Sequence, residues 1–204
     1  LSQGVAYFHA GIDTLRSKSL DANSFDSGDW FNRIDWRYRD NYFGTGAPPA
    51  GDNAASYPWT KPLLANAAIK PGPSEIALAR DMFRDLLQIR ASSTLFRLRS
   101  ANDIQRRLRF DNTGPGQNPV LQVAHLDGLG YAGAGFKELL YLINVDKLPH
   151  AITLPGETGK HYVLHPVHRA PGAADKRPAQ LAAFDAATGR FSVPARTALV
   201  WVVQ

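Results

Sequence analysis

The chain has 204 residues, of which 44% are hydrophobic and 20% charged, a composition typical of a globular protein. No apolar run approaches the ~20 residues of a membrane-spanning helix, and the lack of cysteine excludes disulfides, thiolate catalysis and thiolate metal sites. The formal net charge is +5. The basic residues form one cluster, in residues 105–112, where Arg106 and Arg107 lie on opposite faces of a predicted strand. Nucleic-acid binding favours a one-sided basic stripe, so we expect neither a membrane nor a nucleic-acid partner.

The first 73 residues keep no long helical or strand period. Residues 4–11 (GVAYFHAG) form a short apolar run that ends in glycine, which predicts a buried strand leading into a loop. Residues 12–73 are interrupted by prolines and by the turn-rich GTGAPPAGDN, so we expect an irregular segment. Long irregular loops inside compact proteins are usually functional.

Residues 73–93, PSEIALARDMFRDLLQIRASS, are predicted to form a helix. Pro73, Ser74 and Glu75 are start signals for this helix. Apolar residues then recur at helical spacing and leave one stripe to bury, formed by Ile76, Ala79, Phe83, Leu86 and Leu87.

From residue 94 onward the pattern is that of β-structure, with short runs separated by Gly, Pro, Asn or Asp: LFRL, IQRRLRF, VLQVAHLD, ELLYLINV, AITL, HYVLH, GRFSV and ALVWVV. Strands at such spacing predict an antiparallel sandwich of ~7–8 strands. Trp201, in the last run, is its predicted large core residue. Residues 168–180, HRAPGAADKRPAQ, contain few bulky apolar side chains and are predicted to be an exposed, mobile loop.

One strand and one helix cannot enclose a hydrophobic core by themselves. A final βα unit of a larger α/β barrel resolves this, because its strand pairs with neighbouring strands and its helix covers the outside. The predicted fold is therefore an α/β barrel remnant, the last βα unit of a TIM barrel with its long loop, followed by an all-β antiparallel sandwich. The predicted domains are residues 1–93 for the barrel end and 94–204 for the sandwich.

The loop after the first predicted strand is rich in aromatic and charged side chains. Of the 21 aromatic residues of the chain, 11 lie within the first 60 positions. Aromatic rings offer flat apolar faces to sugars, and Asp, Asn and Arg offer paired hydrogen bonds to hydroxyl groups, so the loop favours a carbohydrate ligand. The alternative is that Trp30, Phe31 and Trp36 are core anchors. In that case a helical turn capped by Ser27 or Asp29 would pair Asp29 with Arg33.

The same loop closely resembles a known family. QGVAYFHAGIDTLRSKSLDANSFDSGDWFNRIDW, followed by DNYFGTGAPP, resembles pullulanase-type α-1,6-glucosidases. These include bacterial pullulanases and plant limit dextrinases, and they belong to glycoside hydrolase family 13. The resemblance is highly specific over residues 4–46, fair over LLQIRASSTLFRL and loose after residue 112.

The resemblance implies a (β/α)8 barrel that hydrolyses α-1,6 branch linkages in pullulan and in starch- or glycogen-derived dextrins. Its expected partners are a branched α-glucan and the N-terminal part of the same barrel. Within SGDWFNR, Asp29 and Arg33 are expected to bind substrate, together with Trp30 and Asn32. The resemblance implies no organic cofactor and a secreted or periplasmic location. Calcium is often bound in the family, but no calcium site can be assigned to these residues.

Retaining glycosidases need two carboxyl groups ~5–5.5 Å apart. The resemblance places the nucleophilic Asp, the acid/base Glu and a third Asp on earlier barrel strands. The glutamates here are Glu75 at the predicted helix start and Glu138 and Glu157 in the β region, and none lies in the aromatic loop. We therefore expect no catalytic residue in this chain and no activity of the chain on its own.

Histidines and surface aromatics are the remaining candidates. His9, on the first predicted strand, is interpreted as a core or supporting residue, with substrate contact as the alternative. His165 and His168 have metal-ligand spacing but lack nearby carboxylates, and an open metal site needs three or more ligands, so no metal site is predicted. The rival function is a non-catalytic carbohydrate-binding or structural β module. A row of exposed aromatics on one sandwich face would favour that module.

Overall fold

The computed structural model describes residues 1–204, which divide into two compact units. One unit contains Tyr7–Phe83, and the other contains Leu1–Ala6 with Arg84–Gln204. The long helix α4 (Pro73–Ser92) contributes residues to both units. The predicted division into a barrel end (residues 1–93) and a sandwich (residues 94–204) stays a prediction. None of the helices is both long and apolar enough to cross a membrane.

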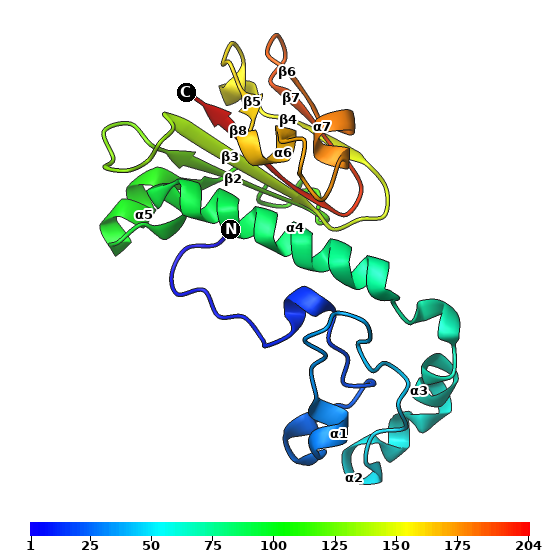
Figure 1. Ribbon diagram of the computed structural model, residues 1–204. Helices are drawn as coiled ribbons and strands as arrows, with labels where there is room; N and C mark the ends of the chain where they lie inside the picture. The colour runs from blue at the N-terminus through cyan, green and yellow to red at the C-terminus, as the bar shows by residue number, and fades with distance from the viewer. The chain divides into compact units, whose positions relative to one another are not determined.

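The larger unit, called the β unit below, contains two antiparallel sheets (Figure 1). The five-stranded sheet has the order β1 (Leu108–Phe110), β2 (Leu121–Asp127), β3 (Glu138–Asn144), β8 (Thr197–Val203) and β5 (Val163–Leu164). The three-stranded sheet has the order β4 (His150–Thr153), β7 (Arg190–Val193) and β6 (Ala183–Asp185). The predicted antiparallel β domain is confirmed, with eight strands.

The five-stranded sheet is buried on both faces, so its strands read as nearly continuous apolar runs. In β3, Leu139 and Tyr141 point to one core, which includes Ile89 near the end of α4. Leu140 and Leu142 point to the other core, between the two sheets. Within this unit, the part of α4 from Arg84 onward covers one face of this sheet, and the three-stranded sheet covers the other (Figure 1).

The core between the sheets is rich in aromatic side chains. Phe184 and Phe191 are stacked, with ring centroids 4.4 Å apart, and Trp201 meets Phe191 edge-on at 6.0 Å. Trp201 is buried, as predicted. Aromatic side chains bury large apolar areas, so this cluster is a main source of the stability of the sandwich.

The start of α4 follows its sequence signals. Pro73 is the first helical residue, where its missing N–H costs no hydrogen bond. The Glu75 carboxylate accepts a hydrogen bond of 2.8 Å from the Gly72 N–H, which is half of a capping box. The predicted helix is therefore confirmed, and one of the three glutamates has a structural role.

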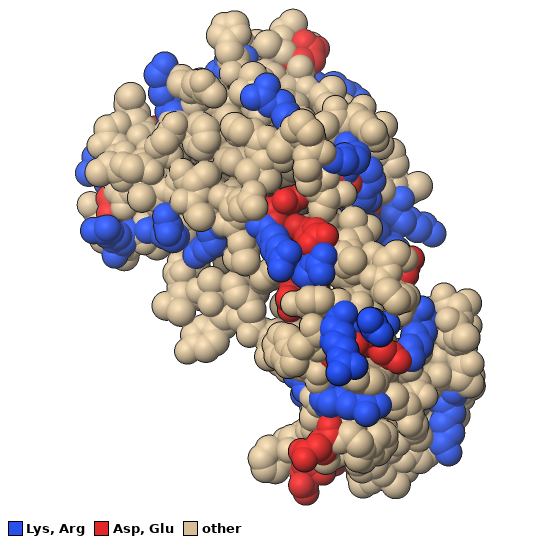
Figure 2. Space-filling model, in the orientation of Figure 1, with Lys and Arg blue, Asp and Glu red and all other residues tan.

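One run predicted as a strand is helical instead, and a second is a strand only in its last three residues, Leu108–Phe110. The first three residues of LFRL lie in the 3-10 helix η5 (Thr94–Arg97). The first four residues of IQRRLRF lie in α5 (Ala101–Arg107), and the last three form β1. The Ser100 hydroxyl accepts a hydrogen bond of 3.0 Å from the Asp103 N–H, so a helix cap overrides the β pattern. Arg106 and Arg107 are thus in the last turn of a helix. On the face drawn in Figure 2, Lys and Arg side chains form separate small groups.

The predicted mobile loop at residues 168–180 is also partly ordered. The chain forms α6 (Pro166–Arg169), which follows β5, and α7 (Arg177–Leu181), which precedes β6. The 3-10 helix η6 (Pro155–Glu157) lies between β4 and β5 in the sequence. His168, Ala173 and Pro178 are buried. Arg177 binds Asp175 through two hydrogen bonds and donates to the Ala195 carbonyl, which fixes the start of α7. Composition alone missed these long-range contacts.

The smaller unit consists of short helices and loops. Its elements are η1 (Ile12–Thr14), η2 (Ser24–Asp26), α1 (Asp29–Asn32), α2 (Ala50–Asn53), η3 (Ala54–Ser56), α3 (Tyr57–Leu64) and η4 (Ala67–Ile69). α3 is regular in spite of Pro58 and Pro62. The buried strand predicted at residues 4–11 is not formed, and residues 4–10 are exposed. A strand needs a neighbour for its backbone hydrogen bonds, and this segment has none.

Candidate functional site

The candidate site is built on the single helical turn α1. Gly28 precedes it with φ of +80°, a conformation that favours glycine, and the Asn32 N–H donates to the Gly28 carbonyl at 3.2 Å. The predicted turn is confirmed, but its predicted cap is wrong, because no side chain caps it. The Ser27 hydroxyl donates to the Asp21 carboxylate instead.

Asp29 and Arg33 leave their charged groups available to a ligand. Both residues are exposed, and no ion pair joins them. Arg33 has extended backbone angles (φ −62°, ψ 154°), so it lies beyond the helical turn that would align the two side chains. Its guanidinium carbon lies 3.7 Å from the ring centroid of Tyr42. The alternative of a local Asp29–Arg33 ion pair is therefore wrong.

The three predicted aromatic anchors behave differently from one another. Phe31 is 2% exposed and is an anchor, whereas Trp30 is 50% and Trp36 66% exposed. Trp30 meets Phe31 edge-on with ring centroids 5.0 Å apart, which steadies the Trp30 ring while leaving its surface open. A Cβ atom at Gly46 would lie 3.4 Å from that ring, so glycine leaves room for it.

The side chain of Asn32 forms hydrogen bonds to the backbone of its own loop. Its side-chain amide donates to the carbonyls of Ser24 at 2.9 Å and Gly28 at 3.3 Å. Of the four predicted substrate residues, Asp29, Trp30 and Arg33 are exposed around one turn, and Asn32 holds that turn in place.

The histidines have separate environments. His9 is exposed, not part of a core. His165 is buried, accepts from the Val167 N–H at 3.3 Å through Nδ1, and contacts the Ser92 hydroxyl at 2.9 Å through Nε2. His168 is buried and accepts from the Val200 N–H at 3.1 Å. Burial lowers the pKa of both rings to about 4. Both therefore serve as neutral packing residues.

Because these two histidines are buried in the neutral form, we expect the stability of the β unit to fall in acid. Their pKa of about 4 lies below the ~6.5 of an unfolded histidine, so their contribution is complete above about pH 6.5 and is lost as the pH falls toward 4. We expect the free energy of unfolding to fall by up to about 3 kcal/mol per ring across this window, measured by urea unfolding.

His168→Gln keeps an acceptor for the Val200 N–H without titrating, so its stability should depend less on pH. The matched control is His161→Gln, because His161 is exposed. An unchanged pH dependence in His168→Gln would contradict the burial argument.

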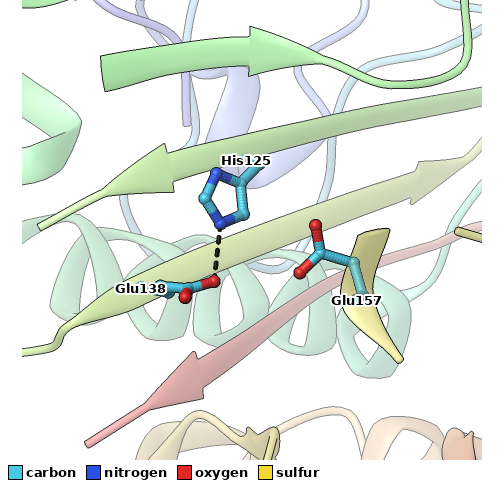
Figure 3. A group of neighbouring side chains, drawn as sticks. All are labelled: His125, Glu138 and Glu157. Atoms are coloured by element: carbon cyan, nitrogen blue, oxygen red, sulfur yellow. Dashed lines mark hydrogen bonds and ion pairs between the residues drawn. The ribbon is translucent and has the colours of Figure 1, made fainter. Parts of the chain in front are cut away.

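A second polar group, which we call the glutamate cluster, lies in the β unit (Figure 3). It comprises His125 of β2, Glu138 of β3 and Glu157 of η6, whose ligand atoms lie within 4.8 Å of one another. The Nζ atom of Lys160 lies 2.5 Å from Glu138 and 2.8 Å from Glu157. The ammonium group thus supplies the positive charge that a metal ion would supply, and the cluster fits an internal ion-pair network.

Hydrogen bonding controls the ionisation of the glutamate cluster. Burial opposes ionisation of Glu138, but hydrogen bonds from Lys160, His125 and Tyr162 prevail and lower its pKa to about 2. The pKa of Glu157 is also lowered, again against burial, by Lys160 and Tyr162. Both carboxylates are therefore charged at neutral pH. Lys160 contacts both, and the Arg109 guanidinium contacts Glu157 at 2.9 Å.

Most of the chain matches one known protein family. The family model for the C-terminal part of pullulanase-type alpha-1,6-glucosidases matches residues 38–204. The chain belongs to this family. The resemblance found in the loop sequence is thereby confirmed.

The relatives of this pullulanase-type chain are plant and bacterial enzymes. Pullulanase 1 of Arabidopsis thaliana, a chloroplastic protein, is 40% identical over 99% of the chain, and a Klebsiella pneumoniae pullulanase is 32% identical over 84%. The crystal structure of PulA from Klebsiella oxytoca superimposes with a TM-score of 0.82 at 28% identity over 95% of the chain. A maltotriose complex of PulA from Klebsiella pneumoniae gives the same TM-score and identity.

The pullulanase-type chain spans about a fifth of the length of these relatives, 21% of the Arabidopsis protein and 18% of the Klebsiella oxytoca chain.

The glutamates of the chain do not form a glycosidase pair. An acid/base carboxyl needs a raised pKa, whereas that of Glu138 is lowered to about 2, and Glu157 is only 1% exposed. The β unit also lacks a row of exposed aromatics, because Phe110 is its one large exposed ring.

Proposed function

We propose that this chain is the non-catalytic C-terminal part of an enzyme that hydrolyses α-1,6-glucosidic linkages in branched α-glucans. It supplies one wall of the glucan cleft and a stabilising β domain. The observation that carries the proposal is the 40% identity with a pullulanase over 99% of the chain. The maltotriose complex of Klebsiella pneumoniae PulA supports an α-glucan as the ligand.

The proposal assigns residues 1–93 to the end of a TIM barrel and residues 94–204 to the sandwich. Large apolar side chains in the first segment support this, because Val5 is 83% and Tyr7 91% exposed. Large apolar side chains that are exposed next to one another usually mark a surface that another part of a protein covers. In the barrel, residues 4–11 become a strand paired with its neighbours, so the loop that follows lies at the substrate-binding face.

The polar groups of this loop receive distinct roles in the proposal. The Asp29 carboxylate accepts hydrogen bonds from sugar hydroxyls, and the Arg33 guanidinium donates them. The exposed face of Trp30 contacts the apolar C–H surface of a glucose ring. Asn32 keeps these groups in place through its bonds to Ser24 and Gly28.

The proposal is tested by comparing the 204-residue chain with the full-length enzyme that carries it. The full-length enzyme should release reducing sugar from pullulan, and the chain alone should release none, because it lacks the acid/base pair. Linear α-1,4-glucan serves as the control substrate and should be left intact. Turnover of pullulan by the chain alone would contradict the proposal.

A further inference from the structure

We infer that Asn53 is a positioning residue for the candidate site, acting on the glucan only through the segment that carries Asp29. The inference rests on the proposed function for its kinetic test. Asn53 is the last residue of α2 and is 3% exposed. Asp29 lies 24 residues earlier in the chain, so any effect of Asn53 on it must pass through tertiary contacts.

The side chain of Asn53 uses its whole amide in hydrogen bonds. Its Nδ2 atom donates to the Asp21 carboxylate at 2.8 Å and to the Pro49 carbonyl at 2.9 Å. Its Oδ1 atom accepts from the Ala22 N–H at 2.9 Å. Asn53 thus fastens the segment at residues 21–22 to α2, and no exposed group remains with which it could bind a ligand itself.

Asp21 passes this restraint to the start of α1. One carboxylate oxygen accepts from Asn53 and from the Asn23 N–H at 3.2 Å, and the other accepts from the Ser27 hydroxyl. Ser27 is buried and directly precedes Gly28, the residue before α1. Asn53 and Ser27 are buried, and Asp21 between them is partly buried. Because hydrogen-bonded groups of this kind move little, the chain Asn53–Asp21–Ser27 sets where the turn begins.

The other end of the turn is held independently. The Arg16 guanidinium donates to the carbonyl of Asn32, the last residue of α1, and to the Ala10 carbonyl at 3.2 Å. With the end of α1 held by Arg16, releasing Asn53 should tilt the start of the turn while the rest of the unit stays folded. Asp29, at that start, is the residue most displaced.

The choice of Asn at position 53 has a chemical consequence. In Asn53→Asp, a carboxylate would face the Asp21 carboxylate, and the like charges would repel each other. When the two groups share one proton, a hydroxyl replaces the lost N–H donor and the contact re-forms. The defect of this variant should therefore be large at neutral pH and shrink in mild acid.

The experiment uses the full-length enzyme with Asn53→Asp, Asn53→Ala and the control Asn23→Ala, which removes only an exposed contact of 3.2 Å to Asp52. At neutral pH we expect Asn53→Asp to lower kcat/KM for pullulan about tenfold, mainly through KM. The ratio to the wild-type enzyme should recover in mild acid, whereas that of Asn53→Ala should not. Asn23→Ala should match the wild type throughout.

Hydrogen exchange at residues 24–33 gives a readout that does not depend on catalysis. It should be faster in Asn53→Asp at neutral pH and return toward the wild-type rate in acid. Wild-type kinetics and exchange in Asn53→Asp, or a defect that acid does not relieve, would overturn the inference. If the Asn53 variants fail to fold, Ser27→Ala decides, with a raised KM supporting the inference and an unchanged KM overturning it. A wild-type enzyme inactive on pullulan would instead overturn the proposed function.

Discussion

Replacing Lys160 by methionine is expected to lower the free energy of unfolding of the β unit by about 3 kcal/mol. Lys160 contacts both carboxylates of the glutamate cluster, and Glu157 is only 1% exposed. Removing one partner of a buried ion pair leaves the other charge less well compensated, which costs more than the pair contributes. After Lys160→Met, Glu157 keeps the Arg109 guanidinium at 2.9 Å, and Glu138 keeps hydrogen bonds from Tyr162 and His125. The expected loss is near the low end of such cases, because the Lys160 side chain is 30% exposed and water reaches it.

The pH dependence of this loss has a definite sign. In the wild type the pKa of Glu138 is lowered from its ordinary 4.5 to about 2, so its contribution is complete above pH 4.5 and is lost as the pH falls toward 2. Lys160→Met removes much of that contribution. The difference from the wild type should therefore be greatest above pH 4.5 and shrink in acid.

Urea unfolding followed by the fluorescence of the buried Trp201 measures the effect of Lys160→Met. Lys137→Met is the matched control, because Lys137 is exposed and makes no side-chain ion pair. A loss in Lys160→Met no larger than in the control would show that the glutamate cluster is solvated rather than paired.

Replacing Asp29 by alanine in the full-length enzyme is expected to lower kcat/KM for branched dextrins about 10- to 150-fold. A hydrogen bond to a charged group contributes about 1.5–3 kcal/mol, and each 1.4 kcal/mol is a factor of ten. The melting temperature should barely change, because Asp29 is exposed and forms no ion pair within the chain. Initial rates over a range of dextrin concentrations, with thermal unfolding beside them, measure both effects.

Asp26→Ala is the control for Asp29→Ala, since Asp26 is an exposed aspartate three residues earlier, at the end of η2. It should leave both kinetics and melting temperature near the wild-type values. A large fall in the melting temperature of Asp29→Ala with normal kinetics would make Asp29 a structural residue instead of a ligand for glucan.

Local sequence patterns predicted the elements whose signals are local. The helix at residues 73–93 has its start signals and its apolar stripe within one segment, and α4 follows them. The runs around β2, β3 and β8 are apolar because both faces of their sheet are buried, so they could be recognised as strands without knowing their partners. Where two local signals competed, as at Ser100, the helix cap prevailed over the β pattern.

The candidate site was predictable only in part. The loop composition and its resemblance to a family pointed to Asp29 and Arg33, and both side chains are exposed. That Asn32 binds the backbone of its own loop was not predictable, since this depends on the fold of residues 24–28. The role of Asn53 was likewise hidden, because its partner Asp21 lies 32 residues away in the sequence.

By itself the sequence determined the family, the long helix and the antiparallel β domain, because each depends on motifs or periods within short windows. Only the tertiary structure decided that Glu138 and Glu157 join Lys160 and Arg109 in one ion-pair network. It also decided that the segment at residues 4–11 has no strand within this chain to pair with. Ionisation and strand pairing both depend on groups far away in the chain. Their energies are set by burial and by neighbours that no local pattern contains.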